Sequence, residues 1–85
     1  MKNKISQRGE HWNKFSELVL AHIENYAVPQ YGDYPNDPVE SWSADMRLKT
    51  AEKYMNRRGK AQRHGEAGLD ILKTVHFLQM GFDKL

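Results

Sequence analysis

A row of basic side chains is the feature of this sequence that most clearly suggests chemistry. Lys49, Lys53 and Arg57 are spaced i, i+4 and i+8, so they lie along one face of a helix. Like charges at this spacing destabilise a helix by roughly 0.2–0.5 kcal/mol per pair, which a facing anion would offset. Arginine binds phosphate through two N–H groups, and lysine adds a mobile charge. The row predicts a site for a nucleotide or another phosphate-bearing ligand, extended by nearby basic residues and by two loop tyrosines that could stack on a base: Arg58, Lys60, Arg63, Tyr31 and Tyr34.

The basic row can also be explained by ion pairs within the chain, and this alternative stays open. Asp45 precedes Lys49 by four residues, and Glu66 and Asp70 on a returning helix could pair with the rest of the row. Charges on helix faces are commonly solvated or paired in this way. In that case the face holds no ligand, and the chain is a non-catalytic helical module that binds a protein partner.

Metal and nucleophile chemistry have little support in the sequence. Glu66 and Asp70 lie one turn apart and could hold Mg²⁺ through one or two oxygens, but the first helix offers only Glu17 and Glu24 to complete a site. We therefore expect no resident metal and no cofactor. Glycine-rich phosphate loops and serine nucleophile motifs are absent, and the spacing of the histidines matches no ligand motif: His11, His22, His64 and His76. Whether the chain catalyses a reaction stays open.

The spacing of apolar residues predicts three main helices and an all-α fold. The first helix covers 10–26, where Trp12, Phe15 and Val19 begin an amphipathic period. We expect Pro29 to end it, because the residue before a proline is disfavoured in the helical region. Residues 27–37 then form a long loop rich in tyrosine and proline.

The second and third helices are expected to form an antiparallel hairpin packed on the first. Asp37 is a candidate N-cap with Glu40 three residues later, so the second helix begins at 38, or at 43 after a short first turn. It ends near 58, where Gly59 suits the position after the last turn. The third helix begins near Glu66.

The third helix is apolar over most of its girth, which a chain of 85 residues cannot easily bury alone. One stripe on it recurs at helical spacing and predicts a homodimer interface: Ile71, Val75, Leu78 and Phe82.

Length and composition favour one helical domain over 1–85, with 1–9 frayed. The chain has no cysteine, no apolar run long enough to span a membrane and no apolar core of a signal peptide, so we expect a cytoplasmic protein without a membrane partner. The formal charge of +2 is too small to indicate nucleic acid by itself. Because seven lysines and arginines lie between Arg47 and His64, weak nucleic-acid binding is kept as a third hypothesis.

Part of the chain resembles a family of small phage-encoded helical proteins. The family pattern begins with Lys-Tyr-x-x-Arg-x-Gly-Lys, and residues 53–60 read Lys-Tyr-Met-Asn-Arg-Arg-Gly-Lys. The pattern continues with Asp-Leu-x-Lys, where residues 70–73 read Asp-Ile-Leu-Lys. It ends with an aromatic residue and leucine, and residues 76–78 read His-Phe-Leu. The match covers about a third of the chain and departs at Ile71. Some members carry a nucleotide-kinase label, so the resemblance implies nucleotide binding and a place in the host cytoplasm.

The helical pattern is also similar, more weakly, to the all-α nucleotide pyrophosphohydrolases, whose Mg²⁺ sites use two acidic pairs on neighbouring helices. Only Glu66 and Asp70 could stand for one such pair. This second resemblance implies the all-α fold of the pyrophosphohydrolases without their Mg²⁺-dependent chemistry.

Overall fold

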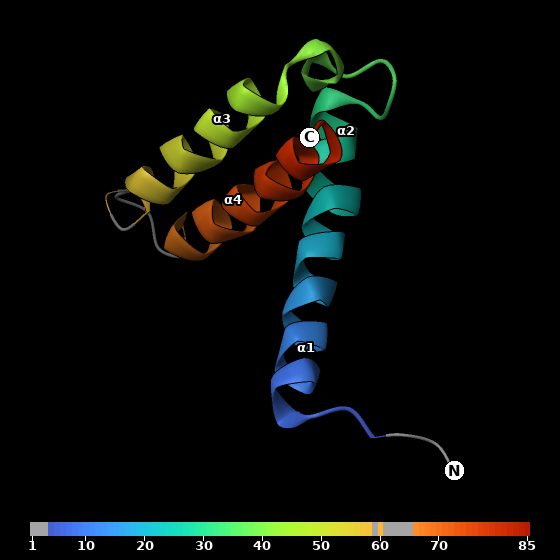
Figure 1. Cartoon of the computed structure of the whole chain (residues 1–85), viewed down its shortest axis with the longest axis vertical. Coiled ribbons are helices and arrows are strands. Elements are labelled where there is room, and N and C mark those ends of the chain that lie inside the picture. Colours follow the sequence, from blue (N-terminus) through green and yellow to red (C-terminus); the bar gives the residue numbers. More distant parts are fainter. Residues whose placement is uncertain (1–3, 59, 61–65) are drawn as a thin grey trace.

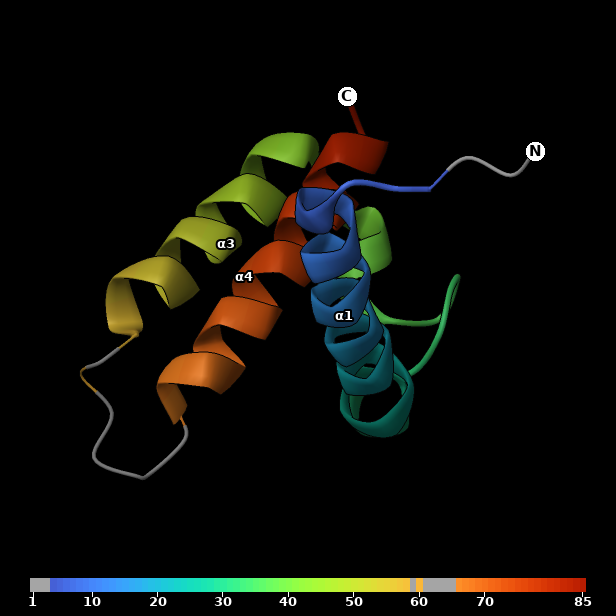
Figure 2. The same ribbon diagram turned by 90° about the horizontal axis from the view of Figure 1, so that it is seen from below.

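The computed structural model describes residues 4–58, 60 and 66–85, and all regular structure in this part of the chain is helical. The predicted all-α fold is confirmed. Helix α4 (Glu66–Asp83) lies between α3 (Ala44–Arg57) on one side and the long N-terminal helix on the other (Figures 1 and 2). No helix among the described residues is both long and apolar enough to cross a membrane.

Helix α1 (Gln7–His22) begins three residues earlier than the apolar period predicts. Its N-cap is Ser6, whose hydroxyl accepts a hydrogen bond from the N–H of Gly9 at 3.0 Å. Glu10 adds a negative charge to the first turn, where it interacts favourably with the helix dipole. The expectation that 1–9 are frayed is therefore wrong for 7–9, because a polar cap begins this helix before its first apolar residue.

Pro29 does not end the first helix, and this prediction is also wrong. The chain passes from α1 into a π-helical segment, η1 (Ile23–Ala27), and then into a last α-helical turn, α2 (Val28–Tyr31). The N–H of Val28 bonds to the carbonyl of Ile23, five residues back. This wider turn leaves room for the proline ring, which in a regular α-helix would clash with the carbonyl four residues before it. The helix ends at Gly32, whose φ of 96° is accessible to glycine.

The second helix starts in two steps, as one alternative predicted. A 3₁₀ turn, η2 (Pro38–Ser41), begins at Asp37, whose carboxylate accepts from the N–H of Glu40 at 2.9 Å. Helix α3 then begins after Ser43, whose hydroxyl accepts from the N–H of Met46 at 3.2 Å. Both caps follow from the preference of Asp and Ser for helix N-termini. The predicted role of Gly59 lies outside the described residues.

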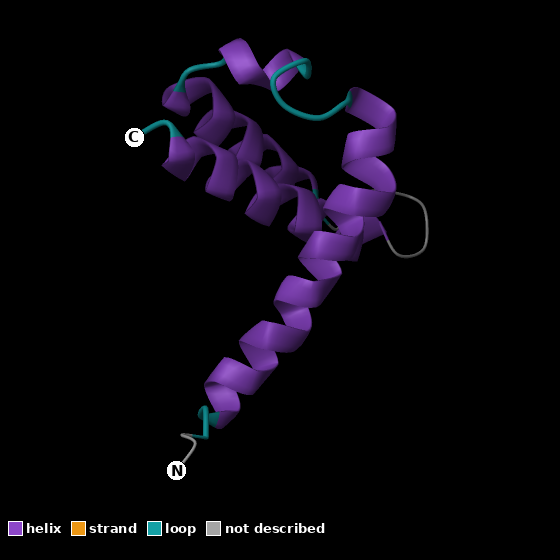
Figure 3. Cartoon of the chain, turned by 90° about the vertical axis from the view of Figure 1, so that its right-hand side faces the viewer, coloured by secondary structure: helices purple, strands orange, loops and turns teal. Residues whose placement is uncertain are grey.

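Helices α3 and α4 form the antiparallel hairpin that the sequence predicts, and α1 contacts α4 (Figure 1). The hairpin is close where Gly81 meets Leu48, since a Cβ on Gly81 would lie 2.5 Å from a Leu48 methyl carbon. Towards its N-terminus α1 leaves the hairpin and projects outward (Figure 3). The first helix therefore covers the hairpin only in part.

Arg47 is the residue that fastens the start of α3 to the end of α4. Its side chain is 2% exposed. Its Nε and Nη2 donate to the carbonyls of Trp42, Val39 and Glu40 at 3.1, 2.7 and 3.0 Å. Its Nη1 donates to the carbonyl of Met80 at 3.0 Å. The guanidinium thus satisfies carbonyls of η2, of the short link after it and of α4, and keeps these segments together.

Candidate ligand-binding cavity

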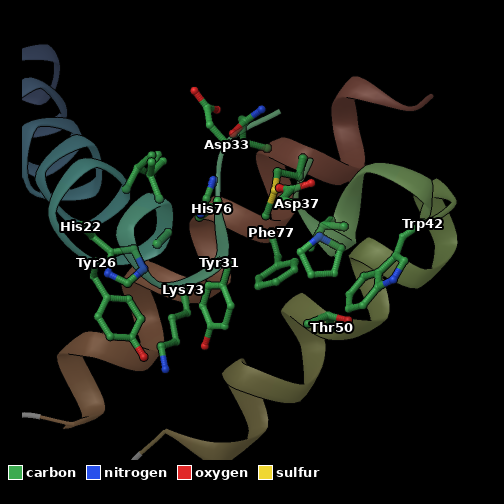
Figure 4. A pocket seen from close by; sticks show the side chains of 18 of the residues that line it. His22, Tyr26, Tyr31, Asp33, Asp37, Trp42, Thr50, Lys73, His76 and Phe77 are labelled. Atoms are coloured by element: carbon green, nitrogen blue, oxygen red, sulfur yellow. The ribbon is translucent and has the colours of Figure 1, made fainter. Parts of the chain in front are cut away.

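A cavity of about 410 Å³ opens where the C-terminal part of the long helix, the following loop and the hairpin meet (Figure 4). Its volume lies within the usual range for small-molecule sites, about 300–1,000 Å³. Each segment contributes side chains: His22 and Tyr26 come from the long helix, Trp42 follows η2, Lys53 comes from α3 and Phe77 from α4. The π-helical turn and the continuation past Pro29 position the wall that the long helix forms.

Aromatic rings form much of the lining. Phe77 stacks between two of them, with ring centroids 5.7 Å from Tyr54 and 6.3 Å from Trp42, and interplanar angles of 27° and 22°. Across the cavity, Tyr26 and Tyr31 meet edge to face at 6.3 Å. Flat apolar faces of this kind suit a planar ligand, and tyrosine adds a hydroxyl for hydrogen bonding.

Two lysines from different helices line the same cavity. Lys73 of α4 places its Nζ 5.4 Å from the ring centroid of Tyr26 and 5.2 Å from that of Tyr54, which are cation–π distances (Figure 4). Lys53 lines the cavity from α3, and it forms no ion pair with any residue in the described part of the chain. The cavity therefore combines aromatic surface with two positive charges.

Two histidines lie on the α1 and α4 sides of the cavity. The rings of His22 and His76 meet edge to face with centroids 6.4 Å apart, and His22 also stacks on Tyr26 at 5.3 Å. Burial, followed by the charge of Lys73, lowers the pKa of His22 below its usual 6.5. Burial, followed by His22, likewise lowers the pKa of His76. Both rings are therefore mainly neutral at pH 7, and each can donate one hydrogen bond and accept one.

Two tyrosines of the lining keep their protons at neutral pH. A hydrogen bond with Tyr26, followed by burial, raises the pKa of Tyr31 above its usual 10.0. Burial raises the pKa of Tyr34 in the same direction. The Tyr31 hydroxyl is engaged with Tyr26, whereas the Tyr34 hydroxyl keeps its proton as a donor. Both residues belong to the predicted ligand set, although Tyr31 lies on a helix and not in the expected loop.

The basic row predicted from the sequence is divided in the structure. Lys49 pairs with Asp45 at 3.5 Å on the open surface and does not line the cavity. Arg57 binds Asp70 through Nη2 and Nε at 2.7 and 3.3 Å. The internal pairing left open above thus accounts for Lys49 and Arg57, and of the row Lys53 is the member that lines the cavity.

The remaining predicted site residues are not brought to the cavity. Arg58 is exposed and donates to the carbonyl of Met55, and Lys60 is exposed. Arg63 and the side chain of Glu66 lie outside the described residues. Asp70, the other weak metal candidate, is 1% exposed and engaged by Arg57. No group of three metal-ligating side chains is placed together in the described part of the chain.

Sequence reasoning did not assign Lys73, His22 or His76 to a site. A signal for two of them was present, because Lys73, His76, Phe77 and Met80 follow one another at i, i+3, i+4 and i+7. Such spacing places polar and aromatic side chains on one helix face. It does not reveal that the long helix brings His22 opposite this face.

Comparison with protein-family models, with curated proteins and with solved structures finds no match to this chain. The resemblance to the phage-encoded family stays a prediction.

Proposed function

We propose that this protein binds a small ligand that joins a planar aromatic group to a phosphate or similar anion, a nucleotide being the class that fits best. The observation that supports this proposal is one cavity lined by aromatic rings together with Lys53 and Lys73. The resemblance to small phage accessory proteins points to the same ligand class. The proposed site is the cavity, and Lys53 is the member of the basic row retained in it.

The two lysines have complementary roles in this proposal. Two ammonium groups in one partly apolar cavity repel each other, and an anion between them removes that repulsion. Lys73 is held beside two tyrosine rings, whereas Lys53 is exposed and can move towards the ligand. A base or similar ring would stack on the aromatic wall that contains Phe77 and Trp42.

Calorimetric titration with nucleoside monophosphates, the matching nucleosides and inorganic phosphate tests the proposal. We expect the monophosphate to bind more tightly than either part alone. Lys53→Gln and Lys73→Gln should each weaken monophosphate binding by about ten- to a hundredfold, because a charge-assisted hydrogen bond contributes about 1.5–3 kcal/mol. Lys49→Gln is the matched control, since Lys49 lies outside the cavity. Unchanged affinity in both cavity variants, or no binding by the wild type, would overturn the proposal.

A non-catalytic interaction module is the second candidate. Its supporting observation is that Ile71, Leu78 and Phe82 of α4 are all exposed, Phe82 to 72%. The third hypothesis, nucleic-acid binding, loses support because Arg57 and Lys49 of the basic row are paired within the chain. Affinity for an oligonucleotide that falls steeply with salt would restore it.

A further inference from the structure

We infer that two copies of this chain associate through an apolar surface formed by α1 and α4, so that each copy covers the outer part of the other's α1. The inference does not rest on the proposed ligand. Its starting point is a groove of about 250 Å³ between the two helices, lined mainly by apolar side chains that include Trp12, Val19, Leu20 and Val75.

The groove continues into a second exposed apolar region. On α4, Val75 belongs to the stripe that also contains Ile71, Leu78 and Phe82, and these three are 37%, 47% and 72% exposed. Three of the four residues of the predicted interface stripe are thus exposed, while Val75 is half-buried. Since Val75 lines the groove as well, the stripe and the groove form one continuous surface.

The outer part of α1 has little of its own chain to pack against. Trp12, in the N-terminal half of α1, is 57% exposed, and the N-terminal end of this helix projects from the hairpin (Figure 3). Most helical stability in proteins comes from burial of an apolar face against other segments. A covering partner would supply that burial.

The accessible area of the whole chain is large enough to leave surface for such an interface. The chain exposes 6737 Å², whereas a compact monomer of 9.9 kDa is expected to expose about 5,200 Å². The excess of about 1,500 Å² is larger than the 800 Å² or so that each partner buries in a standard stable interface. Only two of the apolar side chains, Ala51 and Met80, are buried in the described part of the chain.

A second copy suits this surface because exposed apolar side chains border an apolar groove. In a two-fold interface the same patch serves both partners, so it must complement itself. Trp12 and Leu20 of one copy can enter the groove of the other, while the α4 stripes contact the partner beside it. This geometry extends the dimer predicted through α4 alone by giving α1 the central part.

Sedimentation equilibrium over a hundredfold range of protein concentration tests the inference. We expect the wild type to approach twice 9.9 kDa as concentration rises. The variant Trp12→Glu/Leu20→Glu should weaken association by about a hundredfold or more, because it places charges in an apolar interface. Leu18→Glu is the matched control: Leu18 is 59% exposed on the same helix but does not line the groove.

A measurement that keeps the groove intact guards against a variant that fails to fold. In Trp42→Phe, Trp12 is the one tryptophan left, since the chain has two. Its emission should move to shorter wavelength as concentration rises and the partner covers it. A wild type that stays monomeric, a Trp12 emission independent of concentration, or equal dissociation by Leu18→Glu would each overturn the inference.

Discussion

The guanidinium of Arg57, at the end of α3, donates two hydrogen bonds of 2.7 and 3.3 Å to the carboxylate of Asp70, near the start of α4. At the other end of the hairpin, Arg47 holds the carbonyl of Met80. Two arginines on one helix therefore fasten the two ends of α4, one by charge pairing and one by neutral acceptors. Both contacts lie within the chain and hold α3 and α4 together.

Replacing Arg57 should destabilise the protein because it leaves a buried carboxylate without its partner. Asp70 is 1% exposed, but the Arg57 side chain is 45% exposed, so the loss falls below the full value of a buried pair. We expect Arg57→Gln to lower the free energy of unfolding by about 2–3 kcal/mol, measured by urea denaturation. Lys49→Gln, which breaks an exposed pair, should change it by about 0.5 kcal/mol or less. Equal effects of the two would contradict the assignment.

Substitution of Arg47 should lower the free energy of unfolding more than substitution of Arg57. Arg47→Met keeps much of the buried stem but removes donors to four carbonyls, and we expect a loss of about 3–5 kcal/mol in urea denaturation. Arg47→Lys should recover only part of this, since one ammonium cannot reproduce the planar fork. A lysine variant as stable as the wild type would show that charge, and not geometry, is what this position requires.

The two glycines of α4 should respond in opposite directions to alanine. At Gly81 a new Cβ would meet Leu48 at 2.5 and 2.8 Å, whereas at Gly68 nothing lies within 4 Å. Gly68→Ala should stabilise the protein by about 0.5–1 kcal/mol through helix propensity. Gly81→Ala should destabilise it by about 1 kcal/mol, because overpacking outweighs that gain. Thermal unfolding measures the stability of both alanine variants. In a Leu48→Ala background, Gly81→Ala should destabilise the protein less. Equal stabilisation by both alanines would refute the close contact between Gly81 and Leu48.

Stability should fall as the solution becomes acidic through the pH range in which His22 and His76 would titrate when unfolded. Both pKa values are lowered in the folded protein, so below about pH 6.5 the unfolded chain binds more protons than the folded one. The resulting loss grows with falling pH until the folded pKa values are passed. Urea denaturation at pH 7.5 and 5.5 measures it.

Substitution separates these two histidines from the other acid-sensitive groups. His76→Gln or His22→Gln should make the dependence on pH shallower, while the same change at His11, which is exposed, should leave it as in the wild type. If the free energy of unfolding depended on pH as steeply in His22→Gln and His76→Gln as in the wild type, this account would be contradicted.

Local chemistry in the sequence was sufficient for most of the helical elements, but not for the start of α1 or for the continuation of this helix past Pro29. The spacing of apolar residues identified the three main helices, and the cap at Asp37 followed from residue type, because it depends on a contact only three residues apart. The pairing of Asp70 with Arg57 was one of two open alternatives. Spacing placed both on suitable faces, but a helical period cannot say which faces meet.

Contacts between distant segments decided what the local pattern could not. Arg47 looked like one more charge in a basic segment, yet the return of α4 buries it against Met80, 33 residues away. The helix passes Pro29 through a π-helical turn, and this continuation carries Tyr31 to the cavity beside residues of α3 and α4. The sequence by itself determined the three main helices and where α3 and α4 start. The tertiary structure decided which charges are paired and which line a cavity, because those outcomes depend on how helices far apart in the chain approach and rotate against one another.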